Sequence, residues 1–262
     1  MAMTTGRVSV VGLGPGRADW CVPAVTERLI AATDLVGYGP YLDLIPCPTA
    51  GVRHPSGNRV EADRARDALD LAAAGGDVVV VSSGDPGVFA MASAVMEQLD
   101  ASPERWAGIE IEVVPGVSAA QALAARVGAP LGHDFCIISL SDVLKPWDVI
   151  ERRLHAVADA DFVVALYNPI SRHRPWQLGR AIEIIASHRS PGTPVVVGRH
   201  VGRPDEHVTV VELAAFDPGQ VDMSTVLIVG SSTTKALDGR PLGSSVFTPR
   251  SYPDHHPAGA TP

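Results

Sequence analysis

Short apolar runs that end in glycine-bearing polar loops recur through the first half of the chain. The clearest is residues 78–81, four consecutive valines whose β-branched side chains fit a strand buried on both faces. A polar loop at 82–87 follows, and a helical pattern resumes at Phe89. The runs at 7–16 and 109–114 lead into glycine- or serine-bearing loops in the same way. This repeated order of strand, loop and helix predicts a parallel sheet covered by helices.

Helices in this half are predicted from apolar positions that recur every three to four residues. At 59–74 the pattern puts Ala65, Ala68, Leu69 and Ala72 on one face and most of the charged residues on the other, which we expect to be solvated. The other elements expected here are helices at about 23–32, at 89–99 and from Ser118 to about Arg126, a short strand at 34–38, and a helical turn at 41–45.

The second half of the chain predicts a different kind of sheet. Strands at 135–140 and 161–167 flank a helix at 146–158, in which Pro146 suits the first helical turn. A helix at 176–188 comes next, and the remaining strands are expected at 193–199, 207–213 and 225–229. These last three strands are too close in sequence for a crossover helix between each pair, so the sheet is expected to be mixed.

Length and composition agree with two domains. The chain has 262 residues, of which 46% are hydrophobic, enough for one large core or two moderate cores. We interpret it as an α/β protein with an N-terminal α/β domain at 1–115, whose sheet is mainly parallel, and a C-terminal α/β domain at 116–237, whose sheet is mixed. An extended C-terminal tail is expected at 238–262.

Charge and cysteine content exclude several classes of function. A formal net charge of -8 argues against a general nucleic-acid surface, because phosphate binding relies on clustered lysine and arginine. Cys21, Cys47 and Cys136 show no CxxC spacing, and His255 and His256 have no further ligands beside them, so we place no disulfide and no metal site. Without a charged leader or an apolar run of membrane-spanning length, we expect a cytoplasmic protein that does not bind membranes.

The glycine loop at 12–16 departs from two common nucleotide-binding patterns. A dinucleotide-binding GxGxxG motif needs a third glycine where this chain has Arg17, and Pro15 removes one main-chain donor from the loop. The lysine of a phosphate-binding P-loop is also missing. Neither a dinucleotide site nor a P-loop is therefore predicted here.

The loop after the valine run places Asp85 between Gly84 and Pro86. The glycine permits unusual backbone angles, and the proline disfavours helical backbone at Asp85. Ligands bind where the carboxyl end of a parallel strand meets such a loop, because main-chain donors and acceptors are free there. A turn aspartate often binds only its own backbone, so Asp85 is open to both interpretations.

Two basic loops in this acidic chain suggest a polyanionic small-molecule ligand. They hold Arg172, His173 and Arg174 beside Trp176 in one loop, and Arg199, His200 and Arg203 at another strand end. Guanidinium groups bind carboxylates in a bidentate fork, so the first loop can act as an anion clamp. An ordinary solvated loop is the alternative interpretation of the same residues.

Five stretches, in this order and spacing, resemble the tetrapyrrole methylase family of S-adenosylmethionine-dependent methyltransferases. They are VGLGPG at 11–16, SSGDPGVFA at 82–90, PGVSAAQALAARVGAPLGHDF at 115–135, ALYNP at 165–169 and STVLIVG at 224–230. Each stretch alone is a weak match, but together they span nearly the whole chain. Residues 131–147, 167–177 and 248–253 resemble the branch that methylates C17 of the macrocycle and contracts its ring in cobalamin synthesis, with Ser251 where that branch has glycine.

The resemblance implies two domains that hold S-adenosylmethionine between them in a homodimer, with a tetrapyrrole as substrate. It implies a cofactor site formed by Pro15, Gly84, Asp85, Val88, Ala90, Ser118, Ala119, Tyr167, Asn168, Gly198, Arg199 and Thr225. Candidates for binding the substrate are Arg172, His173, Arg174 and Arg203. Methyl transfer needs alignment more than acid or base, but ring contraction expels a ring carbon as an acetyl group and requires a group that handles a hydroxyl proton. The candidates for that catalytic role, in falling order, are Asp85, Asp142, Lys145 and His133.

Several functions stay open at this point. The same motifs fit a cobalt-containing substrate of this branch, or another tetrapyrrole such as uroporphyrinogen III. Ribosomal RNA is a further substrate class, but the acidic balance and the lack of a continuous basic stripe weigh against it. A noncatalytic cofactor- or partner-binding module belongs to a different class, and it predicts no binding of S-adenosylmethionine or binding without turnover.

Overall fold

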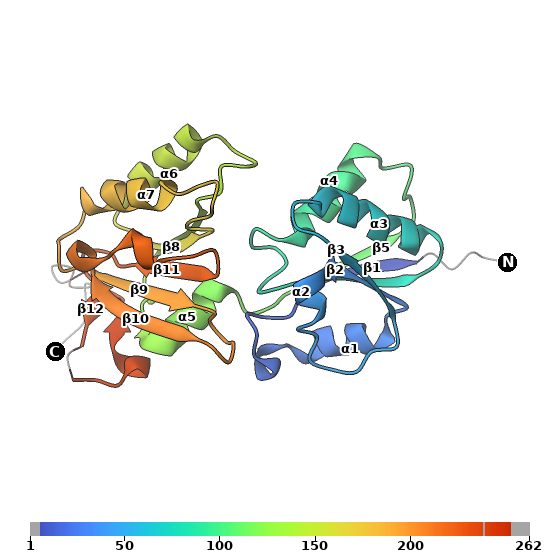
Figure 1. Ribbon diagram of the computed structural model, residues 1–262, viewed down its shortest axis with the longest axis horizontal. Coiled ribbons are helices and arrows are strands. Elements are labelled where there is room, and N and C mark those ends of the chain that lie inside the picture. Colours follow the sequence, from blue (N-terminus) through green and yellow to red (C-terminus); the bar gives the residue numbers. More distant parts are fainter. Residues whose placement is uncertain (1–5, 238, 253–262) are drawn as a thin grey trace, which may run out of the picture. The chain divides into compact units, whose positions relative to one another are not determined.

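The computed structural model describes residues 6–237 and 239–252, and these form two compact units (Figure 1). The first unit ends at Ala119 and the second begins at Ala120. Each unit has its own sheet and its own hydrophobic core. His255 and His256, considered above as metal ligands, lie outside the described residues.

The first unit is built on a five-stranded parallel sheet in the order β3-β2-β4-β1-β5. The strands are β1 Arg7–Gly12, β2 Asp34–Tyr38, β3 Val52–Ser56, β4 Asp77–Ser82 and β5 Glu110–Val114. The helices are α1 Pro23–Ala31, α2 Gly39–Leu42, α3 Glu61–Ala73 and α4 Met91–Ala101, with a short 3₁₀ helix at Ala18–Trp20. In Figure 1, α3 and α4 lie on one face of this sheet and α1 lies on the other.

The valine run of β4 is buried on both faces, as its sequence predicted. Val78 and Val80 pack in one cluster with side chains of α3 and α4. Val79 and Val81 pack in a second cluster with side chains of α1 and α2. Alternate side chains of a strand point to opposite faces, so the run joins both layers of helices to the sheet.

Two local features of this unit differ from the sequence prediction. Strand β3 was not predicted, because it is mostly exposed and contains Pro55, which is tolerated at a sheet edge where no ladder hydrogen bond is lost. Helix α4 begins at Met91 and not at Phe89, whose φ of 53° is left-handed and cannot belong to an α-helix. The loop after β4 is therefore longer than its residue types suggested.

The second unit contains a five-stranded sheet in the order β10-β9-β11-β8-β7. Its strands are β7 Phe135–Ser139, β8 Val163–Tyr167, β9 Pro194–Arg199, β10 His207–Glu212 and β11 Thr225–Val229. The pair β7 and β8 is parallel and the other pairs are antiparallel, which confirms the predicted mixed sheet. Helices α6 Trp147–Asp159 and α7 Gln177–Ala186 pack together over one face, and α5 Ala119–Val127 lies on the other (Figure 1).

A second, small sheet joins the segment after Gly239 to the start of the unit. It is formed by β6 Gly128–Ala129, β12 Lys235–Ala236 and β13 Val246–Phe247, with 3₁₀ helices elsewhere at Leu213–Ala215, Pro218–Gln220 and Leu242–Ser244. The Thr248 hydroxyl donates a 2.6 Å hydrogen bond to the carbonyl of Pro130. Strands of two residues carry no periodic pattern, so the sequence showed only an extended segment here.

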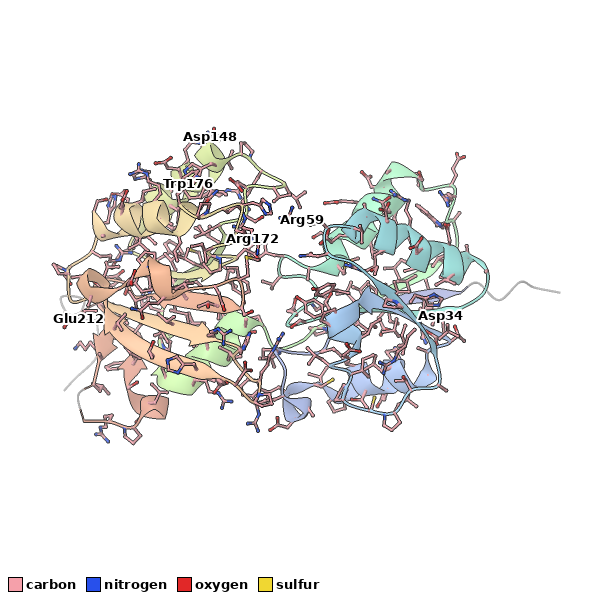
Figure 2. All side chains as sticks on the ribbon, in the orientation of Figure 1. Asp34, Arg59, Asp148, Arg172, Trp176 and Glu212 are labelled. Carbon is pink, nitrogen blue, oxygen red and sulfur yellow. The ribbon has the colours of Figure 1, made fainter. Side chains whose placement is uncertain are left out.

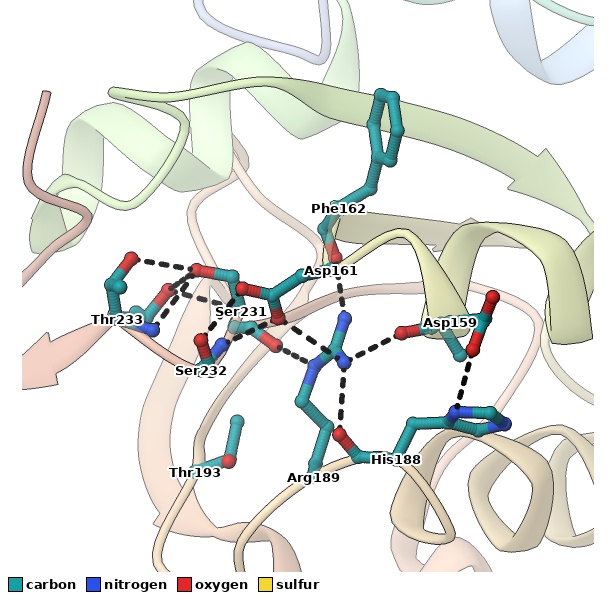
Figure 3. Close-up of polar contacts among 12 residues, drawn as sticks. Asp159, Asp161, Phe162, His188, Arg189, Thr193, Ser231, Ser232 and Thr233 are labelled. Atoms are coloured by element: carbon teal, nitrogen blue, oxygen red, sulfur yellow. Dashed lines mark hydrogen bonds and ion pairs between the residues drawn. The ribbon is translucent and has the colours of Figure 1, made fainter. Parts of the chain in front are cut away.

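The buried side chain of Arg189 joins several segments of the second unit. The Arg189 guanidinium donates to the carbonyls of Ala158 at 2.7 Å and Gly230 at 3.1 Å. It also donates to the carbonyl of Phe162 at 3.0 Å, as Figure 3 shows. It also pairs with Asp161 at 3.2 Å. Burial lowers the pKa of Arg189, and the Asp161 carboxylate opposes this effect. The network joins the ends of α6 and α7 to the end of β11.

Candidate functional site

Three loops of the first unit meet main chain to main chain at the carboxyl ends of β4, β1 and β5. Gly14 and Gly84 exchange two main-chain hydrogen bonds, of 3.1 Å and 2.8 Å. A Cβ added at Gly12 would lie 2.4 Å from the carbonyl oxygen of Gly84, and one added at Gly116 would lie 2.3 Å from the same oxygen. Any side chain at Gly12 or Gly116 would therefore separate the loops.

Asp85 binds the backbone on both sides of this junction. Its Oδ1 accepts a 2.8 Å hydrogen bond from the N–H of Gly87, and its Oδ2 accepts a 3.0 Å hydrogen bond from the N–H of Gly116. The first bond is the turn interaction considered from the sequence, and the second links the loop after β4 to the loop after β5. Asp85 thus holds two loops together, and both oxygens act as acceptors.

The other predicted cofactor residues of this unit lie in the same three loops. Pro15 and Ser118 are buried, and Val88, Ala90 and Ala119 are partly exposed. A small cavity of about 110 Å³ borders the loop after β1 and is lined by Leu13, Gly14, Gly16, Arg17, Ala18, Leu44 and Pro46. Ligand pockets are typically several times larger, so this cavity alone does not enclose a drug-sized molecule. A hollow of about 400 Å³ lies over β3 and α3, and none of the three loops lines it.

In the second unit, two loops follow the parallel neighbours β7 and β8. The side chain of Asn168 donates a 2.9 Å hydrogen bond to the hydroxyl of Ser139, which joins the two strand ends. Asn168 has a φ of 52°, a left-handed conformation that asparagine adopts more readily than most residues. The hydroxyl of Tyr167 accepts a 2.7 Å hydrogen bond from the N–H of Ala120 in the first turn of α5.

Arg174 differs from the other basic residues of its loop because it is buried, with 6% of its surface exposed. Its guanidinium donates to the carbonyl of Asn168 at 2.8 Å and to that of Leu140 at 3.3 Å. A guanidinium occupied by main-chain carbonyls of two loops is not arranged as an open anion clamp, so the structure corrects the expectation for this residue. Arg172 and His173 are exposed and form no hydrogen bond or ion pair within the part of the chain that the structure describes.

Asp142 and Lys145 lie together in the loop that follows β7. Asp142 Oδ2 accepts a 2.9 Å hydrogen bond from the side-chain amide of Gln177, a residue that sequence reasoning did not single out. The pKa of Lys145 is lowered, first by burial and then by the positive charges of Arg153 and Arg174, while Asp142 opposes the shift. A lysine of lowered pKa beside a carboxylate can transfer a proton more easily than an exposed lysine.

His133 is separated from this pair. It precedes β7, whereas Asp142 and Lys145 follow β7, so a five-residue strand of about 16 Å lies between them. Its Nδ1 accepts a 2.8 Å hydrogen bond from the N–H of Asp134, and its ring contacts that of Tyr252 edge to face at 5.3 Å. The structure therefore does not bring His133 to the loops that carry the other candidates of this unit.

The end of β9 holds the remaining candidates. Arg199 donates a 2.8 Å hydrogen bond to Asp222, which raises the arginine pKa, and Thr225 donates to the other oxygen of Asp222 at 2.9 Å. Gly198 faces α5, since a Cβ there would lie 2.4 Å from the Cδ1 atom of Leu123. The main-chain N–H of Arg203 donates to the carbonyl of His200, and the ring of His200 pairs with Asp205.

The described residues provide neither a metal site nor a membrane-spanning helix. No group of three or more histidine, cysteine or acidic side chains is placed to hold a metal ion within 6–237 and 239–252. In the same ranges, no helix has the length and apolar character needed to cross a membrane. Cys21, Cys47 and Cys136 are free, and burial raises the pKa of Cys136 to about 11, which makes that thiol unreactive.

Comparison with known proteins shows extensive similarity. The family model described as Tetrapyrrole (Corrin/Porphyrin) Methylases matches residues 7–217. The cobalamin biosynthesis protein CobIJ of Mycobacterium bovis is 53% identical over 266 residues, which cover 99% of this chain and 51% of that protein. The chain thus spans about half the length of this relative. The precorrin-3B C(17)-methyltransferase of a Sinorhizobium species is 52% identical over 250 residues, with 95% of this chain and 98% of that protein covered.

A solved structure is similar to the same extent. The crystal structure of the methyltransferase CobJ has a TM-score of 0.87 and 51% sequence identity to this chain, and the match covers 93% of this chain and 100% of that one. The three glycine-bearing loops and the loops after β7 and β8 all lie within the residues that the family model matches.

Proposed function

The chain belongs to the tetrapyrrole (corrin/porphyrin) methylase family, and we propose that it methylates precorrin-3B at C17, with ring contraction to precorrin-4, in cobalamin biosynthesis. The observation that carries this proposal is 52% identity to a precorrin-3B C(17)-methyltransferase over nearly the full length of both chains. The motifs at 131–147 and 167–177, which resemble this branch of the family, contain the loops that follow β7 and β8.

S-adenosylmethionine is the proposed methyl donor, and the junction of the three loops fits it. Gly84 has a φ of 68°, and a Cβ built there would meet nothing closer than the carbonyl of Val117 at 3.9 Å and the N–H of Ala119 at 4.0 Å. Main-chain atoms of the loop after β5 therefore lie at van der Waals distance from the position that a side chain at Gly84 would take. When bound, the cofactor supplies an electrophilic methyl group, and its transfer is an in-line displacement that depends mainly on alignment.

The residues proposed to bind the cofactor in the first unit are Pro15, Gly84, Asp85, Val88, Ala90, Ser118 and Ala119. Asp85 acts there by fixing the loops after β4 and β5, as its two hydrogen bonds support. Tyr167, Asn168, Gly198, Arg199 and Thr225 are the proposed contributors from the second unit. Of these, Gly198 has a packing role as well, because α5 fills the space beside it.

Residues of the loop after β7 are proposed to transfer the proton during ring contraction. Asp142 and Lys145 are the proposed acid–base pair, supported by their proximity and by the lowered pKa of Lys145. Gln177 orients Asp142 through its amide, so one carboxylate oxygen has a fixed partner. Asp85 and His133 fit this role less well, since Asp85 is bound by two backbone N–H groups and His133 lies at the other end of β7.

We extend the proposal to a homodimer, which the resemblance to the family implies, and to a cytoplasmic location. Three cysteines without a disulfide among the described residues are compatible with a reducing compartment. Light scattering on the purified protein would measure the oligomeric state, and a monomer at assay concentrations would contradict this part of the proposal.

The test of the proposed function is a turnover experiment with isotopically labelled donor. Purified protein is incubated with methyl-labelled S-adenosylmethionine and precorrin-3B, and the product is examined by mass and absorption for the labelled methyl group and for a retained acetyl group. Turnover of only the cobalt-containing substrate, or of uroporphyrinogen III, would assign a different member of the family. Binding of the donor without turnover of any tetrapyrrole would support a noncatalytic module.

A further inference from the structure

The loop between β7 and α6 exposes two apolar side chains at its tip. Val143 has 63% of its surface exposed and Leu144 has 97%, the largest value among the exposed large apolar residues that the structure describes. The loop is fixed at both ends, because Asp142 binds Gln177 and Pro146 caps α6 in an extended conformation. Val143 and Leu144 lie between these two fixed positions and are exposed.

The loop before α7 ends in a half-exposed tryptophan. Trp176, at the start of α7, is 51% exposed and contacts Trp147 edge to face, with 4.9 Å between ring centroids. The hydrogen bond between Asp142 and Gln177 joins the two loops. Val143 follows Asp142 and Trp176 precedes Gln177, so each is next to a residue of this bond. We call Val143, Leu144, Trp147 and Trp176 the apolar face.

Basic side chains lie in the same two loops as the apolar face. Arg172 and His173 are exposed in the same loop as Trp176 and have no hydrogen-bond or ion-pair partner within the described residues (Figure 2 labels Arg172 and Trp176). Lys145 follows Leu144 directly, and Asp142 and Asp148 are the acidic side chains of that loop and of the first turn of α6. An apolar surface with guanidinium and imidazole groups beside it complements a ligand that is apolar in its body and anionic at its edge.

We propose that the apolar face binds one face of the tetrapyrrole macrocycle, while Arg172 and His173 bind its peripheral carboxylates. Leu144 and Trp176 then strengthen tetrapyrrole binding in proportion to the apolar ring area that they remove from water. The methyl donor does not depend on these two residues for its binding. This inference rests on the proposed function, because it takes a tetrapyrrole as the substrate. It adds the apolar face to Arg172 and His173, which were candidates for substrate binding from the sequence.

The test uses uroporphyrin III, a stable tetrapyrrole that carries only carboxylate side chains, as the probe. Its absorption overlaps tryptophan emission, so its binding is followed by the quenching of protein fluorescence, and donor binding is measured separately by calorimetry with S-adenosylhomocysteine. We expect the wild-type protein to bind the porphyrin. Leu144→Ala should raise the Kd about tenfold, because most of a leucine side chain is lost from the interface. Trp176→Phe should remove part of the quenching.

Ile30→Ala is the matched control, because Ile30 is 56% exposed on α1 of the first unit and should leave the Kd unchanged. Arg172→Ala should weaken binding and reduce its dependence on salt, whereas Leu144→Ala should keep that dependence. Equal Kd values for the wild type and Leu144→Ala, with porphyrin still bound, would refute the apolar face and leave the proposed function intact. Failure of the wild-type protein to bind the porphyrin would overturn this inference, and failure also to turn over any tetrapyrrole would overturn the proposed function.

Discussion

The carboxylate of Asp85 accepts a 3.0 Å hydrogen bond from the main-chain N–H of Gly116, across 31 residues of sequence. This bond joins the loop after β4 to the loop after β5, and the same carboxylate closes its own turn at Gly87. The geometry of the proposed donor site therefore depends on an acceptor at residue 85, more than on a negative charge there.

Replacing Asp85 tests this dependence. Asp85→Asn keeps one carbonyl oxygen but puts an amide NH₂ where the second acceptor was, so it should weaken S-adenosylhomocysteine binding about as much as Asp85→Ala. A loss of about tenfold is expected for a charge-assisted hydrogen bond. Calorimetric titration measures this effect. Asp217→Ala is the matched control, because Asp217 makes the same local 2.8 Å bond to the N–H of Gly219 in a turn of the second unit. Full binding by Asp85→Asn would show that Gly116 does not need this acceptor.

Gly116→Ala should disrupt the junction itself. Its new Cβ would lie 2.3 Å from the carbonyl oxygen of Gly84 and 2.7 Å from that of Gly12, and backbone atoms cannot rotate away as a side chain can. We expect a loss of at least about 2 kcal/mol in the free energy of unfolding, together with lost donor binding. Denaturant unfolding measures the first effect. Gly179→Ala, at a helical position with nothing within 4 Å of the added Cβ, should be neutral or stabilising.

Replacing Arg172 and replacing Arg174 should affect different properties, although the two residues lie in one loop. Arg174→Ala leaves the carbonyls of Leu140 and Asn168 without a donor in a buried place, and should lower the free energy of unfolding by about 2 to 4 kcal/mol. Arg172→Ala should leave stability unchanged and raise the KM for the tetrapyrrole. Thermal unfolding and steady-state kinetics on the two variants separate these effects, and equal Tm losses would contradict the assignment.

The lowered pKa of Lys145 predicts a pH dependence. The folded protein releases the proton of this lysine below the ordinary value of 10.5, while the unfolded chain retains it. In the interval between these two pKa values the unfolded state binds more protons, so this residue makes stability rise with pH there. The basic limb of the kcat profile should shift to lower pH in Asp142→Asn and to higher pH in Arg153→Ala. Unmoved limbs in both variants would remove Lys145 from the proton-transfer step.

Much of the fold could be predicted because its signals are local. The valine run at 78–81 is buried on both faces, and the strand at 225–229 has the predicted bounds, since β-branched apolar residues between turn residues leave little choice. Strand β3 could not be predicted from its own residues, because its pairing with β2 compensates for exposed positions and a proline. Its existence depends on the neighbouring strand.

Some features of the candidate site could be predicted from the sequence, and others depend on the fold. The glycines at 12, 84 and 116 are visible in the sequence at strand ends, and the structure brings their main chains together. Arg174 and Arg172 are indistinguishable as residue types in one loop, but only the fold decides that Arg174 is buried against two carbonyls. The role of Gln177 was missed for the same reason, because its partner Asp142 is 35 residues away.

The measurement that tests the central claim most directly is methyl transfer to precorrin-3B from labelled S-adenosylmethionine, followed by mass spectrometry of the product. The account predicts one labelled methyl group on a ring-contracted product that retains an acetyl group, with turnover strongly reduced by Gly116→Ala and preserved in Gly179→Ala. An active wild-type protein that transfers no label to precorrin-3B, while it methylates a different tetrapyrrole, would contradict the claim.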